Sequence, residues 1–168
     1  LSHNGSSVLL KDGNVCVGIE KERLSRQKHD GNNDSLTVQY CLDSEGITLE
    51  DLSLVVQCAN FEIPSRDNYC GKRLFAEAPD LPIVSISHHL AHAYSAIGTC
   101  PFDAFNIMVI DGCGSPYRQC IDISDANIAD PEIKSAVDMW CEKDSFYHYD
   151  GKKLNTLLKD FSAMSSTE

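Results

Sequence analysis

Two histidines one helical turn apart have the clearest chemical potential in this chain. They are His88 and His92, in the stretch Ser-His-His-Leu-Ala-His-Ala. Because positions i and i+4 share one face of a helix, the two imidazoles can ligate one cation. Asp111, at the end of a strongly apolar segment, supplies a hard carboxylate. This ligand set suits non-haem iron(II), with zinc or manganese as substitutes, and a surface or capping histidine pair is the alternative.

A glycine-containing turn follows directly after Asp111. The sequence Asp-Gly-Cys-Gly places Gly112 and Gly114 where backbone amides of a turn can approach a phosphate, so we expect both to bind substrate. A plain hairpin turn is the other interpretation. His89 does not share the face of His88 and His92. His89 could contact the metal ligands, contact the substrate or have no role in the site.

A dense block of charges forms a second candidate site. It spans residues 20–30 and holds the chain's main cluster of basic residues. Arg26 and Lys28 could meet a phosphate there, and His29 adjoins them. The alternative is a solvated charged loop. His3, among small polar residues at the start of the chain, could line a pocket.

These side chains need strands and helices to position them. Apolar runs around an Asp-Gly-Asn turn predict a hairpin over residues 7–19, and helical spacing predicts helices from Ser35 to about Gly46 and over 88–97. The remaining expectations are strands at 54–58, 81–87, 105–110 and 139–148, a hairpin partner for 105–110 at 117–123, a turn at 149–152 and a helix over 154–161. This order predicts an α/β fold with a mixed sheet, like the start of each half of the actin-like, sugar-kinase-like ATPases.

Composition narrows the classes of partner. The chain has 168 residues and a net charge of −11, which argues against a DNA or RNA binder. No apolar run approaches the roughly 20 residues of a membrane-spanning helix, and no signal peptide is visible. None of the eight cysteines forms a C-x-x-C pair. We therefore expect a cytoplasmic protein with reduced cysteines and a small-molecule substrate.

Four ordered blocks resemble the O-carbamoyltransferase family of nodulation and antibiotic biosynthesis. The family's N-terminal domain is similar to the universal tRNA threonylcarbamoyl-transfer protein. The matching stretches are His-Asn-Gly-Ser-Ser at 3–7, Glu-Lys-Glu-Arg-Leu-Ser-Arg-Gln-Lys-His-Asp at 20–30, His-His-Leu-Ala-His-Ala at 88–93 and Phe-Asp-Ala with Val-Ile-Asp-Gly-Cys-Gly between 102 and 114. Ser115 stands where the family has an acidic residue, and residues 125–137 look like an insertion.

The resemblance implies a role for each matching position. His88, His92 and Asp111 match the family's metal ligands, usually for iron, and a further Asp beyond residue 168 completes that site. His3 and Lys28 match catalytic residues that hold the carbamoyl and phosphate groups, with Arg26, His29, His89, Gly112 and Gly114 as the expected substrate contacts. The implied reaction carries a carbamoyl group from carbamoyl phosphate, through a carbamoyl-adenylate made with ATP, to a small-molecule hydroxyl.

The expected domain organisation follows from the same resemblance. Residues 1–100 would form a first lobe and 101–168 the start of a second, with the adenylate-forming C-terminal domain absent and the fragment inactive alone. The rest of its own longer chain is then an expected partner, and a homodimer is left open. The alternatives are a tRNA threonylcarbamoyl-transfer relative and a non-catalytic metal- or nucleotide-binding module.

Overall fold

The chain forms two compact units. The computed structural model describes residues 4–31, 35–58, 75–124, 126–128 and 140–163. Unit 1 comprises residues 1–55 and 64–83, and unit 2 comprises 56–63 and 84–168. Each unit has its own secondary structure, and the expected division into two lobes at residue 100 stays a prediction.

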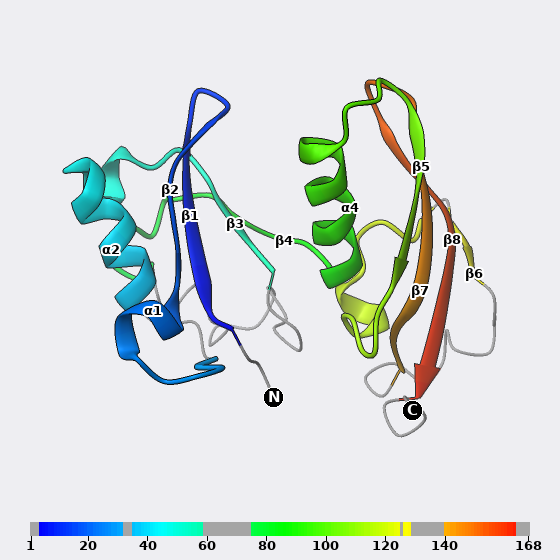
Figure 1. The fold of residues 1–168 in the computed structure, drawn as a ribbon, viewed down its shortest axis with the longest axis horizontal. Helices are drawn as coiled ribbons and strands as arrows, with labels where there is room; N and C mark the ends of the chain where they lie inside the picture. The colour runs from blue at the N-terminus through cyan, green and yellow to red at the C-terminus, as the bar shows by residue number, and fades with distance from the viewer. Residues whose placement is uncertain (1–3, 32–34, 59–74, 125, 129–139, 164–168) are drawn as a thin grey trace. The chain divides into compact units, whose positions relative to one another are not determined.

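Unit 1 is built on the predicted β-hairpin. Strands β1 (Ser6–Lys11) and β2 (Asn14–Glu20) are antiparallel, and Asp12 and Gly13 form the connection with φ values of 51° and 79°. An Asp-Gly pair tolerates these positive φ values, which suit the twist of a two-residue hairpin. Helix α1 (Lys21–Ser25) follows β2 directly, and helix α2 (Ser35–Glu45) packs against the hairpin. Figure 1 shows α2 beside β1 and β2.

Short elements lead from one unit into the next. The 3-10 helix η1 (Leu49–Asp51) begins with a capping box, in which Thr48 and Asp51 satisfy each other's backbone amides. Strands β3 (Val55–Gln57) and β4 (Ile83–Ser85) then pair in a two-stranded sheet. Both strands lie within the predicted ranges.

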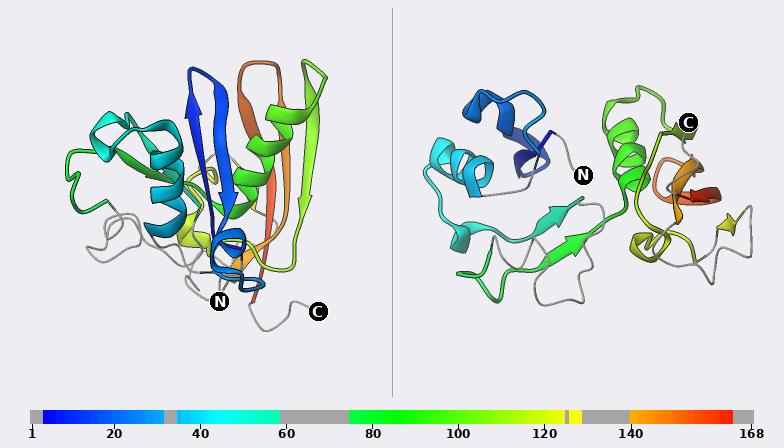
Figure 2. Two further views of the ribbon diagram at one scale, coloured as in Figure 1. Left: turned by 60° about the vertical axis from the view of Figure 1, so that its left-hand side comes forward. Right: turned by 90° about the horizontal axis from the view of Figure 1, so that it is seen from below.

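Unit 2 is a four-stranded sheet with a helix on one face. The strand order is β5-β7-β8-β6, where β5 is Phe105–Ile110, β6 Asn127–Ile128, β7 Trp140–Tyr149 and β8 Leu154–Ala163. β7 is antiparallel to both β5 and β8, and β6 runs parallel to β8. Helix α4 (His88–Thr99) lies along β5 and β7 (Figure 1 and Figure 2). The core between them comprises Leu90, Ala93, Ile107, Val109 and Tyr147.

The predicted partner of β5 was wrong. Residues 117–123 hold the 3-10 helix η2 (Tyr117–Gln119), and β5 pairs instead with β7. Pro116 fixes its own φ and lacks an amide donor, which disfavours a continuous strand at this point. Tyr117 and Cys120 pack with Phe161 in a second small cluster, so these apolar residues serve a compact turn.

The predicted helix over 154–161 was also wrong, because this segment is strand β8. Its apolar residues at 154, 157, 158 and 161 have helical spacing. The ladder explains the pattern: Phe146 pairs with Leu158 and Tyr147 with Thr156, so Leu157 is an extra residue. Such a bulge breaks the period-two alternation and imitates a helical period. The expected turn before β8 is present, with Gly151 at φ 93°.

The α/β class with a mixed sheet is confirmed, and the actin-like assignment stays a prediction. Among the described residues, no helix is long and apolar enough to cross a membrane.

Candidate metal centre

Helix α4 begins at the first predicted ligand. Ser87 is its N-cap and accepts a hydrogen bond from the Leu90 amide at 3.3 Å. The helix runs without interruption to Thr99, so His88 and His92 lie one turn apart on the same face. The neighbouring Ala93 is buried in the core, which fixes the opposite face against the sheet.

The three predicted ligands converge in the structure. His88 Nε2 lies 2.7 Å from Asp111 Oδ2, and His92 Nε2 lies 3.2 Å from His88 Nε2. One donor atom from each of the three residues falls within a 4.8 Å cluster. Asp111 reaches this position because β5 ends at Ile110, beside the first turn of α4. The structure therefore brings these three residues together, while their role as metal ligands stays a prediction.

Local contacts determine the ionisation of the Asp111 carboxyl and the orientation of the His88 ring. Burial acts to raise the pKa of Asp111, but hydrogen bonds from the Gly112 amide and from His88 hold it below its ordinary value. The carboxyl is therefore ionised at neutral pH. The Nδ1 atom of His88 lies 4.0 Å from Cys58 Sγ, which leaves Nε2 as the atom that faces Asp111.

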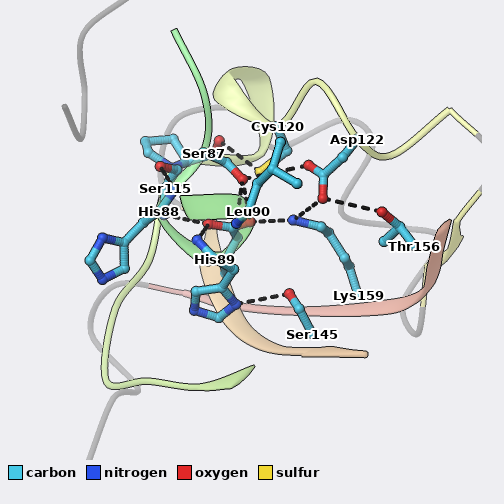
Figure 3. Close-up of polar contacts among 12 residues, drawn as sticks. Ser87, His88, His89, Leu90, Ser115, Cys120, Asp122, Ser145, Thr156 and Lys159 are labelled. Carbon is cyan, nitrogen blue, oxygen red and sulfur yellow. Dashed lines mark hydrogen bonds and ion pairs between the residues drawn. The ribbon is translucent and has the colours of Figure 1, made fainter. Parts of the chain in front are cut away.

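A buried charge cluster lies behind the helix start, and the sequence analysis did not find it. Glu142 and Lys159 are fully buried and form an ion pair, and Lys159 also contacts Asp122 at 2.9 Å. Figure 3 shows Lys159 reaching Asp122, which also accepts from Thr156. We call Glu142, Lys159 and Asp122 the buried cluster. The ligand atoms of its two carboxylates and of Cys120 lie close enough together to hold a metal ion. The Lys159 ammonium, however, already contacts both carboxylates.

The charges of the buried cluster stabilise one another. Burial acts to raise the pKa of Glu142, yet the Lys159 ammonium and the hydrogen bond from the Ser115 amide hold it below its ordinary value. Burial likewise acts to lower the pKa of Lys159, and the Glu142 carboxylate outweighs this and raises it. Both groups are therefore charged at neutral pH, as expected for a desolvated pair with further hydrogen bonds.

His89 points away from the three predicted ligands. Its ring is fully buried, and Nδ1 lies 2.8 Å from Ser145 Oγ on β7. In Figure 3 the His88 ring points out of the buried cluster, whereas the His89 ring lies beside Ser145. Burial lowers the pKa of His89, so a neutral ring is favoured. This position supports a structural role and gives no support to substrate contact.

The glycines after Asp111 have different surroundings. The Gly112 amide donates to Asp111 Oδ1 at 2.6 Å, and the Gly114 amide donates to the Glu142 carbonyl at 2.8 Å. A Cβ on Gly114 would lie 2.7 Å from the Glu142 Cβ and 2.8 Å from the His89 ring, whereas one on Gly112 would meet nothing within 4 Å. Gly114 is thus required by close packing, and substrate binding by either glycine stays a prediction.

The second predicted site lies in unit 1. Lys28 Nζ contacts Glu22 Oε1 at 3.3 Å, and the His29 amide donates to Glu22 Oε2 at 3.1 Å. Arg26 ends helix α1 with φ 61°, and the His29 ring reaches Asn4 Oδ1 at 3.3 Å. The charged block therefore has a defined local structure around Glu22. His3 lies outside the described residues.

The buried basic residue of this block is one that the sequence analysis did not select. Lys21 donates to the Gly31 carbonyl at 3.1 Å and pairs with Asp30 at 3.1 Å. Its position directly after strand β2, in line with the buried alternation of that strand, was the available signal. Lys21 thus connects the start of the charged block to Asp30 and Gly31 at its end.

Comparison with known proteins identifies the class of protein. Residues 1–66 match the family described as the carbamoyltransferase N-terminus, and together with the first relative below this match shows that the chain belongs to the family. The chain is 32% identical over 134 residues to the nodulation protein NolNO of Sinorhizobium fredii, an alignment that covers 67% of this chain and 20% of that protein. The resemblance found in the sequence is therefore confirmed.

Two uncharacterized relatives extend the comparison. A Synechocystis protein is 24% identical over 192 residues, covering 92% of this chain and 31% of its own length. A 19.2 kDa protein of Rhizobium etli is 32% identical over 84 residues, covering 48% of this chain and 46% of its own length. The chain thus spans less than half the length of each curated relative described here.

Proposed function

We propose that this chain contributes a divalent metal site to an O-carbamoyltransferase. Its reaction would transfer a carbamoyl group from carbamoyl phosphate, through a carbamoyl-adenylate made with ATP, to a hydroxyl of a small natural product. The observation that carries the proposal is the convergence of His88 Nε2, His92 Nε2 and Asp111 Oδ2 on one point. Membership of the carbamoyltransferase family supplies the reaction class.

The donor set fits a metal with open coordination positions. Ligand atoms about 2.1 Å from a shared ion lie roughly 3 Å apart, and the two closest donor pairs here are 2.7 Å and 3.2 Å apart. Two imidazoles and one carboxylate favour iron(II), with zinc or manganese as substitutes. A bound ion would polarise a carbonyl or phosphoryl oxygen as a Lewis acid.

The chain's own residues would orient the donor and acceptor. The side chains of His88 and Asp111 are 32% and 36% exposed, so a substrate can reach the ligand face. A shallow depression beside His92 is lined by Ala96 and residues 107–110 of β5. This depression would give the acceptor a partly apolar surface next to His92.

The charged block is the proposed anion site. Lys28 is 80% exposed and its ammonium contacts the Glu22 carboxylate, so a phosphate oxygen could take the place of Glu22. Arg26 and His29 belong to the same block and are further candidates, and His3 is a candidate because it matches a family residue that holds these groups. Neutralising a phosphate by a lysine and an arginine is common in phosphate recognition.

The first test is metal content. Freshly purified wild-type protein should bind one iron(II), or one cobalt(II) in competition, by elemental analysis and calorimetry. The double variant His88→Ala/His92→Ala should lose at least a hundredfold in affinity. His148→Ala is the matched control, because His148 is a half-buried histidine of β7 whose ring hydrogen-bonds Asn106. Equal affinity in the double variant would exclude this site.

The second test is transfer itself. A longer chain that covers the length of the relatives should form a carbamoylated hydroxyl only with ATP, carbamoyl phosphate and metal. Asp111→Asn should abolish this product without changing the fold. Stoichiometric metal binding with no transfer by the longer chain would favour a non-catalytic metal-binding module instead.

A further inference from the structure

One buried carboxylate contacts both segments that carry the proposed metal ligands. Glu142 Oε2 accepts from the His89 amide at 3.1 Å and from the Ser115 amide at 2.9 Å. His89 belongs to the first turn of α4, next to His88, while Ser115 follows the turn that begins at Asp111. Glu142 therefore joins the histidine helix to the aspartate turn through two hydrogen bonds to one oxygen.

The backbone of the same residue reinforces this connection. The Gly114 amide donates to the Glu142 carbonyl at 2.8 Å, and the Glu142 amide donates to the Ser115 carbonyl at 3.0 Å. The Ser115 hydroxyl then accepts from the His88 amide at 2.9 Å. The turn after Asp111 is thereby held to strand β7 on one side and to the first turn of α4 on the other.

The other carboxylate oxygen anchors the arrangement. Glu142 Oε1 accepts from Ser87 Oγ, the helix N-cap, at 3.0 Å and pairs with Lys159. Asp122, at 2.9 Å from Lys159, supplies the opposite charge on the far side of the ammonium. These partners of Glu142 all lie in unit 2. A carboxylate at a helix N-terminus is also favoured by the aligned peptide dipoles.

Stability alone gives no strong reason for such a cluster. Replacing a buried ion pair with packed apolar residues is often neutral or stabilising, because desolvation offsets the attraction between the charges. The hydrogen bonds of this cluster reach the two segments that carry the proposed ligands, so the cluster can orient those ligands. Fixed outer contacts orient the ligands of metal sites, and their loss typically weakens metal binding 10- to 100-fold.

We propose that Glu142, anchored by Lys159 and Asp122, is a positioning residue that sets the distance between His88 and Asp111. The inference rests on the proposed metal site for its functional consequence. In the part of the chain that the structure describes, the buried cluster contacts backbone amides of the ligand-bearing segments and not the imidazole or carboxylate atoms of the three ligands, so it acts through the backbone. The direct consequence of this role is therefore the relative position of the His88 and Asp111 side chains in the metal-free protein.

The deciding variants change reach and charge separately. Glu142→Asp shortens the side chain by one methylene, so it cannot reach Lys159 and both amides together. The double variant Glu142→Gln/Lys159→Met removes both charges but keeps an acceptor for the amides. Lys143→Met is the control for the lysine change, because Lys143 lies on β7 with an exposed side chain 3.8 Å from Asp160.

Two readouts separate this inference from the proposed function. In metal-free protein, the ring nitrogen shifts of His88 and His92 should move in Glu142→Asp and stay near wild type in the double variant and in Lys143→Met. The His148 ring should stay unchanged in all of them. Cobalt(II) affinity should fall at least tenfold in Glu142→Asp and remain within about threefold in the other two.

The outcomes are distinct. Wild type that binds no cobalt overturns the proposed function, and the metal-free ring shifts still decide the positioning role. A folded Glu142→Asp with unchanged ring shifts overturns the positioning role, whether or not cobalt binds. If Glu142→Asp does not fold, Ser115→Ala decides, because it removes only the hydroxyl that accepts from the His88 amide. Unchanged His88 shifts in Ser115→Ala would then contradict the inference.

Discussion

The two units each contain a glutamate that pairs with a lysine and accepts backbone hydrogen bonds, in opposite surroundings. In unit 1, the Lys28 side chain is 80% exposed and its partner Glu22 is six residues away. In unit 2, Glu142 and Lys159 are both 0% exposed, and Glu142 accepts from an amide 53 residues away. The same chemical pair thus serves a local loop in one place and a long-range junction in the other.

The difference in burial decides the energetic weight of each pair. An exposed pair is screened by water and ions and contributes little to stability. A buried pair gives little net stability when intact, yet removing one member leaves an uncompensated charge in the interior. Unit 2 should therefore respond far more strongly to substitution than unit 1.

The largest expected effect comes from Lys159→Met. This change leaves Glu142 and Asp122 buried without their cation, and we expect a loss of about 3 kcal/mol in the free energy of unfolding. Urea unfolding followed by circular dichroism measures it. Lys143→Met serves as the control for the same chemical change on an exposed side chain. A loss below about 1 kcal/mol would show that the cluster is not an essential buried ion pair.

Gly114→Ala should have the next largest effect. The added Cβ would lie 2.7 Å from the Glu142 Cβ, and such overpacking typically costs about 1–3 kcal/mol. Gly112→Ala is the matched control, because a Cβ there meets nothing within 4 Å. Thermal unfolding of the two variants makes the comparison. Equal melting temperatures would mean that the turn can shift away from β7 at little cost.

Acid should destabilise unit 2 through Glu142. The pKa of this carboxyl is lowered in the folded protein from an ordinary value of 4.5. Its contribution is thus fully present above pH 4.5 and is lost as the pH falls towards the folded pKa, with a slope of about 1.4 kcal/mol per pH unit. Urea unfolding between pH 3 and pH 6 measures the slope. Glu142→Gln/Lys159→Met should flatten it, and an unchanged slope would assign the acid sensitivity to other carboxyls.

Lys28→Ala should have the smallest effect on stability, with no measurable change in the unfolding midpoint. Its readout is the pKa of Glu22, which the His29 amide and then Lys28 hold below the ordinary value. Loss of Lys28 should raise this pKa only part of the way, because the His29 hydrogen bond remains. Carboxyl-detected NMR titration follows it. A complete return to the ordinary value would assign the whole effect to the lysine.

The parts of the site that could be predicted are those that depend on residues close together in the sequence. His88 and His92 could be placed on one helix face from their spacing, and Asp111 at a strand end from the apolar run before it. The role of Glu142 could not, because its partners His89, Ser115 and Lys159 come from separate elements. Nothing in the segment around Glu142 indicates burial, since Lys143 and Asp144 continue a polar run.

The fold shows the same division between local and long-range information. The Asp12-Gly13 hairpin and helix α4 follow from turn chemistry and local periodicity, and both were predicted. Strand β8 was mistaken for a helix because a bulge at Leu157 disturbs its alternation. The partner of β5 lies some 30 residues along the chain, and the sequence does not specify that pairing locally.

The bulge in β7 has a consequence for how this strand tolerates changes in length. Glu142 pairs with Phe161 and Asp144 with Asp160, so Lys143 is the extra residue. That extra residue lets Glu142 share the helix-facing side with Ser145 and Tyr147, although strict alternation would put them on opposite sides. Deleting Lys143 would turn the carboxylate out of the interior while leaving every amino acid of the cluster in place. In homologues, a one-residue deletion at Lys143 would thus indicate a changed contact between β7 and the ligand-bearing segments more reliably than a substitution of Glu142.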